Sequence, residues 1–327
     1  MARTEQTRWT RHGTYAMVAA MDPGELAGAE RRVWAALPTG TRAALAGLPA
    51  ADLRTLLLTV ARDRAAAVRP ADVLRRWRED RLVRPSEVDP RVLARLEARL
   101  WERLPADVAG VELSPVVPLG SCSSVAPVSQ NRIVTTMRGA EVVSDPTNAL
   151  AVEAAARRQR QPRTGEVHLA AVHRVLRAQD FGPGAAAHFR LFTLVSSARD
   201  TGSGRTEARL LVRHLAWWRA ILAELARSAA PGLHATVLDD AVLGERLADT
   251  VRPALAADGI PLRDEPQRRR GRGYYRGCAL RLTLDDGAWE VGDGGLTDWT
   301  ARLTGDAKER CLVSCLATER LVTGAPG

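Results

Sequence analysis

Hydrophobic residues recur at helical spacing through the first third of the chain. From Gly24 to Arg84 the spacing is that of helices interrupted by glycine and proline. The pair Asp89-Pro90 is typical of a helix start, because aspartate caps the first turn and proline fits the first helical position. Leucine then recurs on one helix face before Pro105, at Leu93, Leu96, Leu100 and Leu104.

The middle of the chain alternates between helical and strand-like patterns. We expect a helix over Thr147–Arg160, opened by Asp145-Pro146, and a long amphipathic helix whose apolar face carries Leu211, Leu215, Trp218, Leu222 and Leu225. Strand-like stretches fall at Val111–Val117, Val172–Gln179, His188–Ser196 and Leu233–Leu238, and a loop is expected at Phe181–Ala187.

The C-terminal part contains a hairpin pattern. Apolar residues alternate with others from Cys278 to Leu284, and Asp285-Asp286-Gly287 supplies the turn. Strands joined by hairpins and flanked by helices indicate an α+β fold with a mixed, mainly antiparallel sheet.

Composition excludes several classes of protein. The chain of 327 residues is 46% hydrophobic and 26% charged, which is the balance of a globular protein. No apolar run is long enough to span a membrane, and the N-terminus lacks a signal-peptide segment. The four cysteines include no CxxC pair, and Cys311 and Cys315 fall in a stretch that we interpret as a helix. We therefore expect a cytoplasmic protein without a membrane anchor or a metal site.

The net charge of +9 comes almost entirely from arginine, since Lys308 is the only lysine. The arginines are spread along the chain, so a high-GC genome explains them more simply than an RNA partner. The stretch Arg75-Arg76-Trp77-Arg78 would suit RNA, although a solvated helix face with one buried tryptophan explains it better.

Several short motifs occur in a specific order along the chain. They are a helix followed by a strand bearing Pro115, Leu176-Arg177-Ala178-Gln179, His188 to Phe192, Arg270 to Tyr275, Gly294-Gly295 with Asp298, and Glu319-Arg320-Leu321. Their order over residues 88–323 resembles the catalytic core of class II aminoacyl-tRNA synthetases. The resemblance is greatest to histidyl-tRNA synthetase and to its paralogue, the regulatory subunit of ATP phosphoribosyltransferase.

The resemblance implies an N-terminal helical region at residues 1–87, a synthetase-like core at 88–327, and a homodimer formed through Leu93–Val117. It also implies an ATP site with Mg²⁺ bridging the phosphates. Arg177 would hold the α-phosphate, His188 would reach the outer phosphates, and Phe192 would stack on adenine beside Gln179. Arg320 would hold the γ-phosphate from the opposite side.

For the acid substrate, the resemblance implies that Arg270 contacts the carboxylate and that Tyr274 and Tyr275 line the pocket. The segment Asp145–Asn148 corresponds to a loop that grips the amino group, with Thr147 as the contact and Asp145 balancing an ammonium charge. Arg281 stands near the position of a family glutamate, and this reversal of charge favours an acidic or phosphorylated ligand.

Each of these residues also has a purely structural interpretation. Arg177 would be one more ion-paired arginine, a phenylalanine on a strand is usually part of the core, and Glu319-Arg320 would be a helix-end pair. The sequence also departs from the family: Gln179 replaces a glutamate, Gly273 an aspartate, Leu296-Thr297 an Arg-Tyr pair, and Val313 and Ala317 replace glycines. No anticodon-binding domain is expected after the last motif.

Three functions remain open from the sequence. The first is a ligase that adenylates an amino or related acid with ATP and passes it to a small molecule, a carrier protein or tRNA. The second is a non-catalytic paralogue that binds a metabolite and regulates a partner. The third is an RNA-binding module built on the N-terminal helices.

Overall fold

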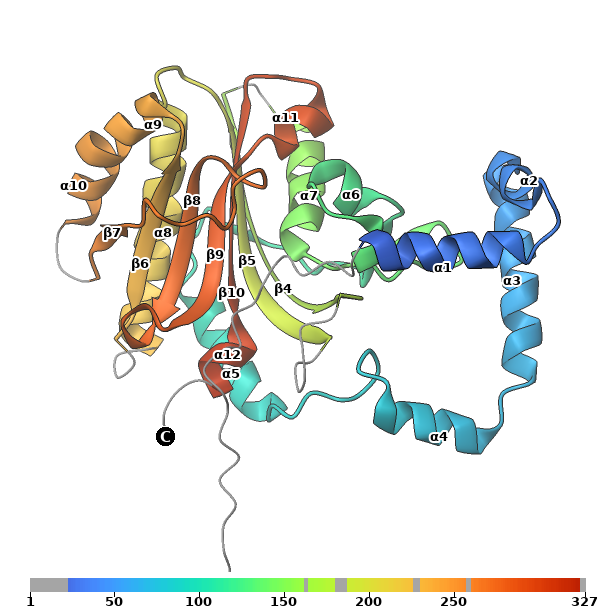
Figure 1. Cartoon of the computed structure of the whole chain (residues 1–327). Coiled ribbons are helices and arrows are strands. Elements are labelled where there is room, and N and C mark those ends of the chain that lie inside the picture. Colours follow the sequence, from blue (N-terminus) through green and yellow to red (C-terminus); the bar gives the residue numbers. More distant parts are fainter. Residues whose placement is uncertain (1–22, 162–163, 180–186, 226–229, 257–259, 324–327) are drawn as a thin grey trace, which may run out of the picture.

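The computed structural model describes residues 23–161, 164–179, 187–225, 230–256 and 260–323 (Figure 1). Its centre is an eight-stranded sheet in the order β1-β4-β5-β10-β9-β8-β6-β7, in which only the pairs β1–β4 and β6–β7 are parallel. This confirms the mixed, mainly antiparallel α+β fold expected from the sequence. The strands are β1 (Ala109–Gly110), β4 (Glu166–Leu176), β5 (His188–Arg199), β6 (Gly232–Leu238), β7 (Leu262–Asp264), β8 (Arg276–Leu284), β9 (Trp289–Thr297) and β10 (Glu309–Ala317).

Helices cover both faces of the sheet (Figure 1). The sheet and α8 enclose the larger core, to which α5, α9 and α10 also contribute buried residues, and a second core lies between the other face and α6, α7 and α11. The bounds of these helices are α5 (Pro90–Glu102), α6 (Ser121–Val125), α7 (Pro146–Arg160), α8 (Arg205–Leu225), α9 (Ala241–Arg246), α10 (Arg252–Leu255) and α11 (Trp299–Thr304). The short helix α12 (Thr318–Thr323) follows β10 directly.

Local signals in the sequence explain the starts of the helices that matter most. The Asp89 side chain accepts a hydrogen bond from the Arg91 backbone amide, and Asp145 caps α7 in the same way through Thr147. Both helices begin with proline, as expected. The turn at Asp285–Gly287 also joins β8 to β9 as expected.

The stretch containing Cys311 and Cys315 is strand β10, so the expectation of a helix there is wrong. β10 pairs with β5 on one side and β9 on the other. Residues four apart share a face on a strand as well as on a helix, so the spacing of the cysteines does not distinguish the two. Cys311 is buried in the core, whereas Cys315 is only partly buried.

The region expected to be one strand at Val111–Val117 is less regular. Two residues before it form β1, and β2 (Val116–Pro118) pairs with β3 (Ala140–Val142) in a separate two-stranded sheet. The short 3₁₀ turn η1 (Gln130–Arg132) lies between α6 and β3. The expected loop Phe181–Ala187 lies outside the described residues except for Ala187.

Four N-terminal helices precede this core: α1 (Pro23–Ala35), α2 (Thr41–Gly47), α3 (Ala50–Ala66) and α4 (Pro70–Glu79). Helices α2, α3 and α4 have no buried residue. Trp77 on α4 is 51% exposed, which corrects the expectation that it is buried. No helix among the described residues is long and apolar enough to cross a membrane.

The segment after α4 contacts the core at the end of the β4–β5 hairpin. The Arg81 guanidinium donates a hydrogen bond of 2.8 Å to the backbone oxygen of Gln179. His188 Nε2 lies 2.7 Å from the backbone oxygen of Arg84. These contacts connect the N-terminal helices to the strands that carry the candidate site.

Candidate functional site

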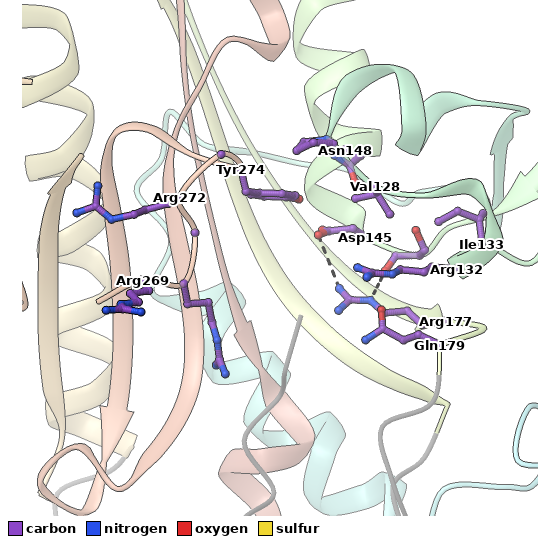
Figure 2. A pocket seen from close by; sticks show the side chains of 15 residues that line it. Val128, Arg132, Ile133, Asp145, Asn148, Arg177, Gln179, Arg269, Arg272 and Tyr274 are labelled. Carbon is purple, nitrogen blue, oxygen red and sulfur yellow. Dashed lines mark hydrogen bonds and ion pairs between the residues drawn. The ribbon is translucent and has the colours of Figure 1, made fainter. Parts of the chain in front are cut away.

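Two adjoining cavities lie beside the N-terminus of α7. The first has a volume of about 360 Å³, the second about 60 Å³, and both are lined by Asp145, Arg177 and Arg270. Figure 2 shows the first cavity, with the ion pair of Arg177 and Asp145 in its wall. The three shared residues were all predicted from the sequence.

Arg177 lies where β4 ends, and its backbone amide donates a 2.8 Å hydrogen bond to the Ala187 oxygen. Its side chain is held from two sides. Arg177 Nε donates to the Ser144 backbone oxygen at 2.8 Å, and a terminal nitrogen lies 3.7 Å from the Asp145 carboxylate. The guanidinium therefore has a fixed position in both cavities.

Asp145 and Thr147 form the cap of α7. Asp145 Oδ1 accepts hydrogen bonds from the Thr147 amide at 2.9 Å and from the Thr147 hydroxyl at 2.7 Å. Thr147 is buried and lines neither cavity, so in this structure its hydroxyl serves the helix cap. Asp145 has its second carboxylate oxygen directed toward Arg177.

The residue pair His188 and Phe192 faces away from Arg177, contrary to the expectation that all three form one wall. Leu176 is paired with His188 in the register, so the neighbouring Arg177 points to the opposite face of the sheet. The His188 Nδ1 atom lies 2.9 Å from Arg174 instead. The buried Phe192 ring packs against Trp101 and Trp217, at centroid distances of 5.1 and 5.2 Å. Phe192 is therefore a core residue and has no face available to adenine.

Phe189, which is also buried at 4% exposure, lies on the Arg177 face of the sheet where Phe192 was expected. It pairs with Val175, two residues before Arg177, and therefore shares a face with Arg177. The Arg177 guanidinium carbon lies 5.1 Å from the Phe189 ring centroid, and both side chains line the second cavity. The sequence contained this signal, because an offset of three residues between two phenylalanines on a strand places them on opposite faces.

The segment before β8 provides another wall of the first cavity. Tyr274 lines it, whereas Tyr275 is buried beneath and lines neither cavity. A Cβ at Gly295 would lie only 2.5 Å from Cγ of Tyr275, so glycine is needed there for close packing. Gly273, where the resembled family has aspartate, has a φ of +79°, a conformation that favours glycine.

Two of the arginines expected to meet substrate, Arg270 and Arg281, are partly neutralised by acidic residues. Arg270 lies 3.4 Å from Glu290, and Arg320 on α12 donates to the backbone oxygen of Glu290. Both line the second cavity. Arg281 pairs with Glu265 and, at 3.2 Å, with Glu290, and it lines neither cavity. Arg281 therefore offers no charge to an acidic or phosphorylated ligand in either cavity, contrary to the expectation from the sequence.

Gln179 lines the first cavity beside Arg177, as Figure 2 shows. Of the two residues that replace family glycines, Val313 is buried in the core and Ala317 lines the second cavity. The Ala317 methyl group therefore takes up space in the site, as the sequence suggested.

Two residues of the site were missed besides Phe189. Asp293 and Cys315 line the second cavity, and the Cys315 thiol donates to Asp293 at 3.2 Å. Burial, with Glu290 nearby, raises the pKa of Asp293 above its usual value. Asn148, on the first turn of α7, lines the first cavity. Among the described residues, no group of three or more histidine, cysteine or acidic side chains is placed to hold a metal ion.

Solved structures share this arrangement of sheet and helices. Apo histidyl-tRNA synthetase of S. aureus matches 73% of this chain and 67% of its own, with a TM-score of 0.57 and 16% identity. The core has the class II aminoacyl-tRNA synthetase fold. An ATP phosphoribosyltransferase regulatory subunit/histidyl-tRNA synthetase from Bacillus halodurans shares this synthetase fold over 74% of the chain and 82% of its own, with a TM-score of 0.55 and 11% identity.

A histidine–tRNA ligase subunit from Alicyclobacillus acidocaldarius also has the synthetase fold, with a TM-score of 0.53 and 12% identity over 73% of this chain and 94% of its own. No protein-family model and no curated protein sequence matches the chain. These structural similarities establish the synthetase fold. They do not establish the chemistry of the site, which depends on the residues that line it.

Proposed function

We propose that this protein adenylates an amino acid or related acid with ATP. In this reaction a carboxylate oxygen of the acid attacks the α-phosphorus, the bond to the β-phosphate oxygen breaks, and an acyl adenylate and pyrophosphate result. The reaction needs positioned charge and little acid–base chemistry from the protein. Arginines around a stacking ring are suited to that task.

The observation that carries the proposal is the position of Arg177 over Phe189 in the second cavity. A planar aromatic ring would stack on adenine, and a guanidinium fork would hold two oxygens of the α-phosphate. Arg320 lines the same cavity from α12 and would take the outer phosphates. These groups come from different elements and converge on one space.

The first cavity would hold the acid. Asp145 lies at the junction of the two cavities and would balance the charge of an ammonium group on the acid. Arg270 also lines both and would meet the carboxylate near the α-phosphate. Asp293 also lines the second cavity, where its carboxylate accepts a hydrogen bond from the Cys315 thiol, and it is a second group suited to a cation.

Mg²⁺ would enter with the phosphates of ATP, because it commonly binds through one or two carboxylates and the phosphate oxygens. Asp293 and Glu290 are acidic residues of the second cavity, which Arg320 and Arg270 also line. When bound, the ion would neutralise charge on the phosphates as pyrophosphate leaves.

ATP–pyrophosphate exchange tests the proposal, with purified protein and a panel of the twenty amino acids and related acids. We expect exchange with one class of acid and its loss, by a factor of about 10² or more, in Arg177→Ala. Arg174→Ala is the matched control, because Arg174 is on the same strand but faces away and pairs with Glu319. Exchange that survives in Arg177→Ala at the wild-type rate would contradict the proposed site.

A non-catalytic, metabolite-binding regulatory subunit is the second candidate. The Ala317 methyl group in the second cavity favours it, since it narrows the place proposed for ATP. The ion pair of Arg270 with Glu290 also lowers the positive charge offered to phosphates. In that case Arg177→Ala would leave binding of a protein partner unchanged, as measured by co-purification.

Two further properties belong to this proposal. A homodimer formed through Leu93–Val117 would cover Val116, which is exposed on β2. Analytical ultracentrifugation of the wild type and Val116→Glu would test it, the variant being expected to dissociate. The acceptor of the activated acid would be a small molecule, a carrier protein or tRNA, and incubation of the adenylate with each identifies it.

A further inference from the structure

Asn148 is a buried amide without a partner in the wall of the first cavity. Its side chain is 1% exposed, and neither Oδ1 nor Nδ2 has a hydrogen-bond partner. Burying both a donor and an acceptor without partners is costly, so such groups in a cavity wall point to a ligand that satisfies them. Its own backbone amide is already used in the first turn of α7, where it bonds to the Asp145 oxygen at 3.2 Å.

The surroundings of Asn148 differ from those of Arg177. Figure 2 shows Asn148 with Val128 and Tyr274 at the α7 end of the cavity, while Arg177, Gln179 and Arg132 lie at the other end. At the α7 end, therefore, an apolar residue and the Tyr274 ring accompany a single carboxamide. The Asp145 carboxylate lies between the two ends, and the arginines that would pair with an anionic ligand group lie at the far end.

We propose that Asn148 determines which acid binds. It would recognise a neutral group on the side chain of the acid that carries a hydrogen-bond donor and an acceptor side by side. A carboxamide is the simplest such group, so the substrate class is an acid with a side-chain carboxamide. This inference rests on the proposed function only in assigning the first cavity to the acid.

The geometry of hydrogen bonding separates this class from others. The oxygen and nitrogen of an asparagine amide point in parallel, and a second carboxamide pairs with both at once. A carboxylate only accepts and an ammonium only donates, so either would leave one Asn148 atom unpaired. The two nitrogens of an imidazole diverge, so one planar amide cannot reach both.

The test measures binding by calorimetry without ATP, using L-glutamine, L-asparagine, L-glutamate and L-leucine. We expect one of the two carboxamide acids to bind at least about tenfold more tightly than glutamate or leucine, because a site built for hydrogen bonds rejects ligands that leave its groups unpaired. In Asn148→Leu, which has nearly the same shape, that preference should disappear while leucine binds no more weakly.

Two further variants make the result specific. Asn131→Leu replaces the only other asparagine, which is exposed and lines neither cavity, and should keep the wild-type preference. Asn148→Asp keeps an acceptor and loses the donor, so it should bind L-ornithine better than glutamine. Thermal melting should show Asn148→Leu at least as stable as wild type, since it removes an unpaired buried amide.

Failure of this inference is distinct from failure of the proposed function. If exchange with some acid occurs and Asn148→Leu leaves its selectivity unchanged, the role of Asn148 is wrong and adenylation stands. If carboxamide acids are selected through Asn148 without exchange, the inference stands and catalysis fails. Equal binding of all four acids, no binding of any, or a change in ATP affinity alone would overturn the inference.

Discussion

The guanidinium carbon of Arg177 lies 5.1 Å from the ring centroid of Phe189, on the face of the sheet that also carries Cys315 and Asp293. The two residues come from consecutive antiparallel strands and are brought together by the register of a single hairpin. Phe189 therefore lies on the face of the sheet that we propose to be catalytic. Phe192, three residues further along β5, lies on the opposite face and packs in the core.

The first prediction compares the two phenylalanines. Phe189→Leu should weaken ATP binding about tenfold, because the ring proposed to stack on adenine is lost. Phe192→Leu should leave ATP binding unchanged and lower the free energy of unfolding by about 1–2 kcal/mol, because it disturbs packing against three tryptophans. Calorimetry with ATP and urea denaturation of both variants measure this, and the reverse assignment of effects would contradict the account.

The second prediction concerns the buried ion pair of Arg158 on α7 and Glu309 on β10. The two side chains are 3% and 6% exposed, and Glu309 also accepts from the Ser197 hydroxyl at 3.1 Å. Arg158→Met should lower the free energy of unfolding by about 3–5 kcal/mol, since it leaves a buried carboxylate without its partner.

The exposed pair of Arg91 and Asp89 is the control for that experiment. Arg91→Met should change the free energy of unfolding by less than about 1 kcal/mol, because exposed ion pairs contribute little. Urea denaturation measures both variants, and a loss of similar size in the two would show that the Arg158–Glu309 pair is not buried in solution.

The third prediction is a loss of stability in acid. Burial lowers the pKa of His214 to about 3, and the ring is hydrogen-bonded to Ser196 at 2.9 Å and Ser314 at 2.8 Å. Between the unfolded pKa of about 6.5 and the folded value, the unfolded chain binds a proton that the folded chain excludes. Stability therefore falls as the pH drops below about 6.5, and this histidine alone contributes a loss of about 2 kcal/mol at pH 5.

Urea denaturation from pH 7 to pH 5 measures this slope. In His214→Gln the part of the slope that His214 contributes should vanish, since glutamine keeps a donor and an acceptor but does not titrate. An identical slope in wild type and variant would contradict the assignment to His214.

The fourth prediction follows from the ion pairs of Arg281. Because Glu265 and Glu290 hold its guanidinium away from both cavities, Arg281→Gln should not alter which acids bind. The variant should be less stable to urea than wild type, because two partly buried carboxylates lose their partner. A switch in selectivity from acidic to neutral ligands in Arg281→Gln would restore the charge argument made from the sequence.

The sequence predicted the fold well because helix caps and turns act within a few residues and because the motifs follow a specific order along the chain. The caps at Asp89 and Asp145 and the turn at Asp285–Gly287 act within a few residues. The order of the motifs pointed to the synthetase fold, although the identity to the matched structures is only 11–16%. Arg177, Asp145, Arg270 and Arg320, which the sequence singled out, line the cavities, and their roles remain proposals.

The sequence-based predictions were wrong where the role of a side chain depends on strand register or on a partner far away in the chain. The choice of Phe192 over Phe189 failed because a strand reverses face at every residue, and the sequence alone did not fix the pairing of His188. Arg281 was misread because its carboxylate partners lie 16 and 9 residues away in the chain and meet it only in the folded sheet. Asn148 lies in the Asp145–Asn148 segment that the resemblance assigned to the substrate amino group, but its unpaired side chain depends on what surrounds it in the fold.

Calorimetric titration of the wild-type protein with ATP and Mg²⁺ tests the central claim most directly. The account predicts binding that is weakened at least about tenfold by Arg177→Ala and is unchanged by Arg174→Ala, on the opposite face of the same strand. Absence of ATP binding by the wild type, or equal losses in the two variants, would contradict a nucleotide site at Arg177 and Phe189.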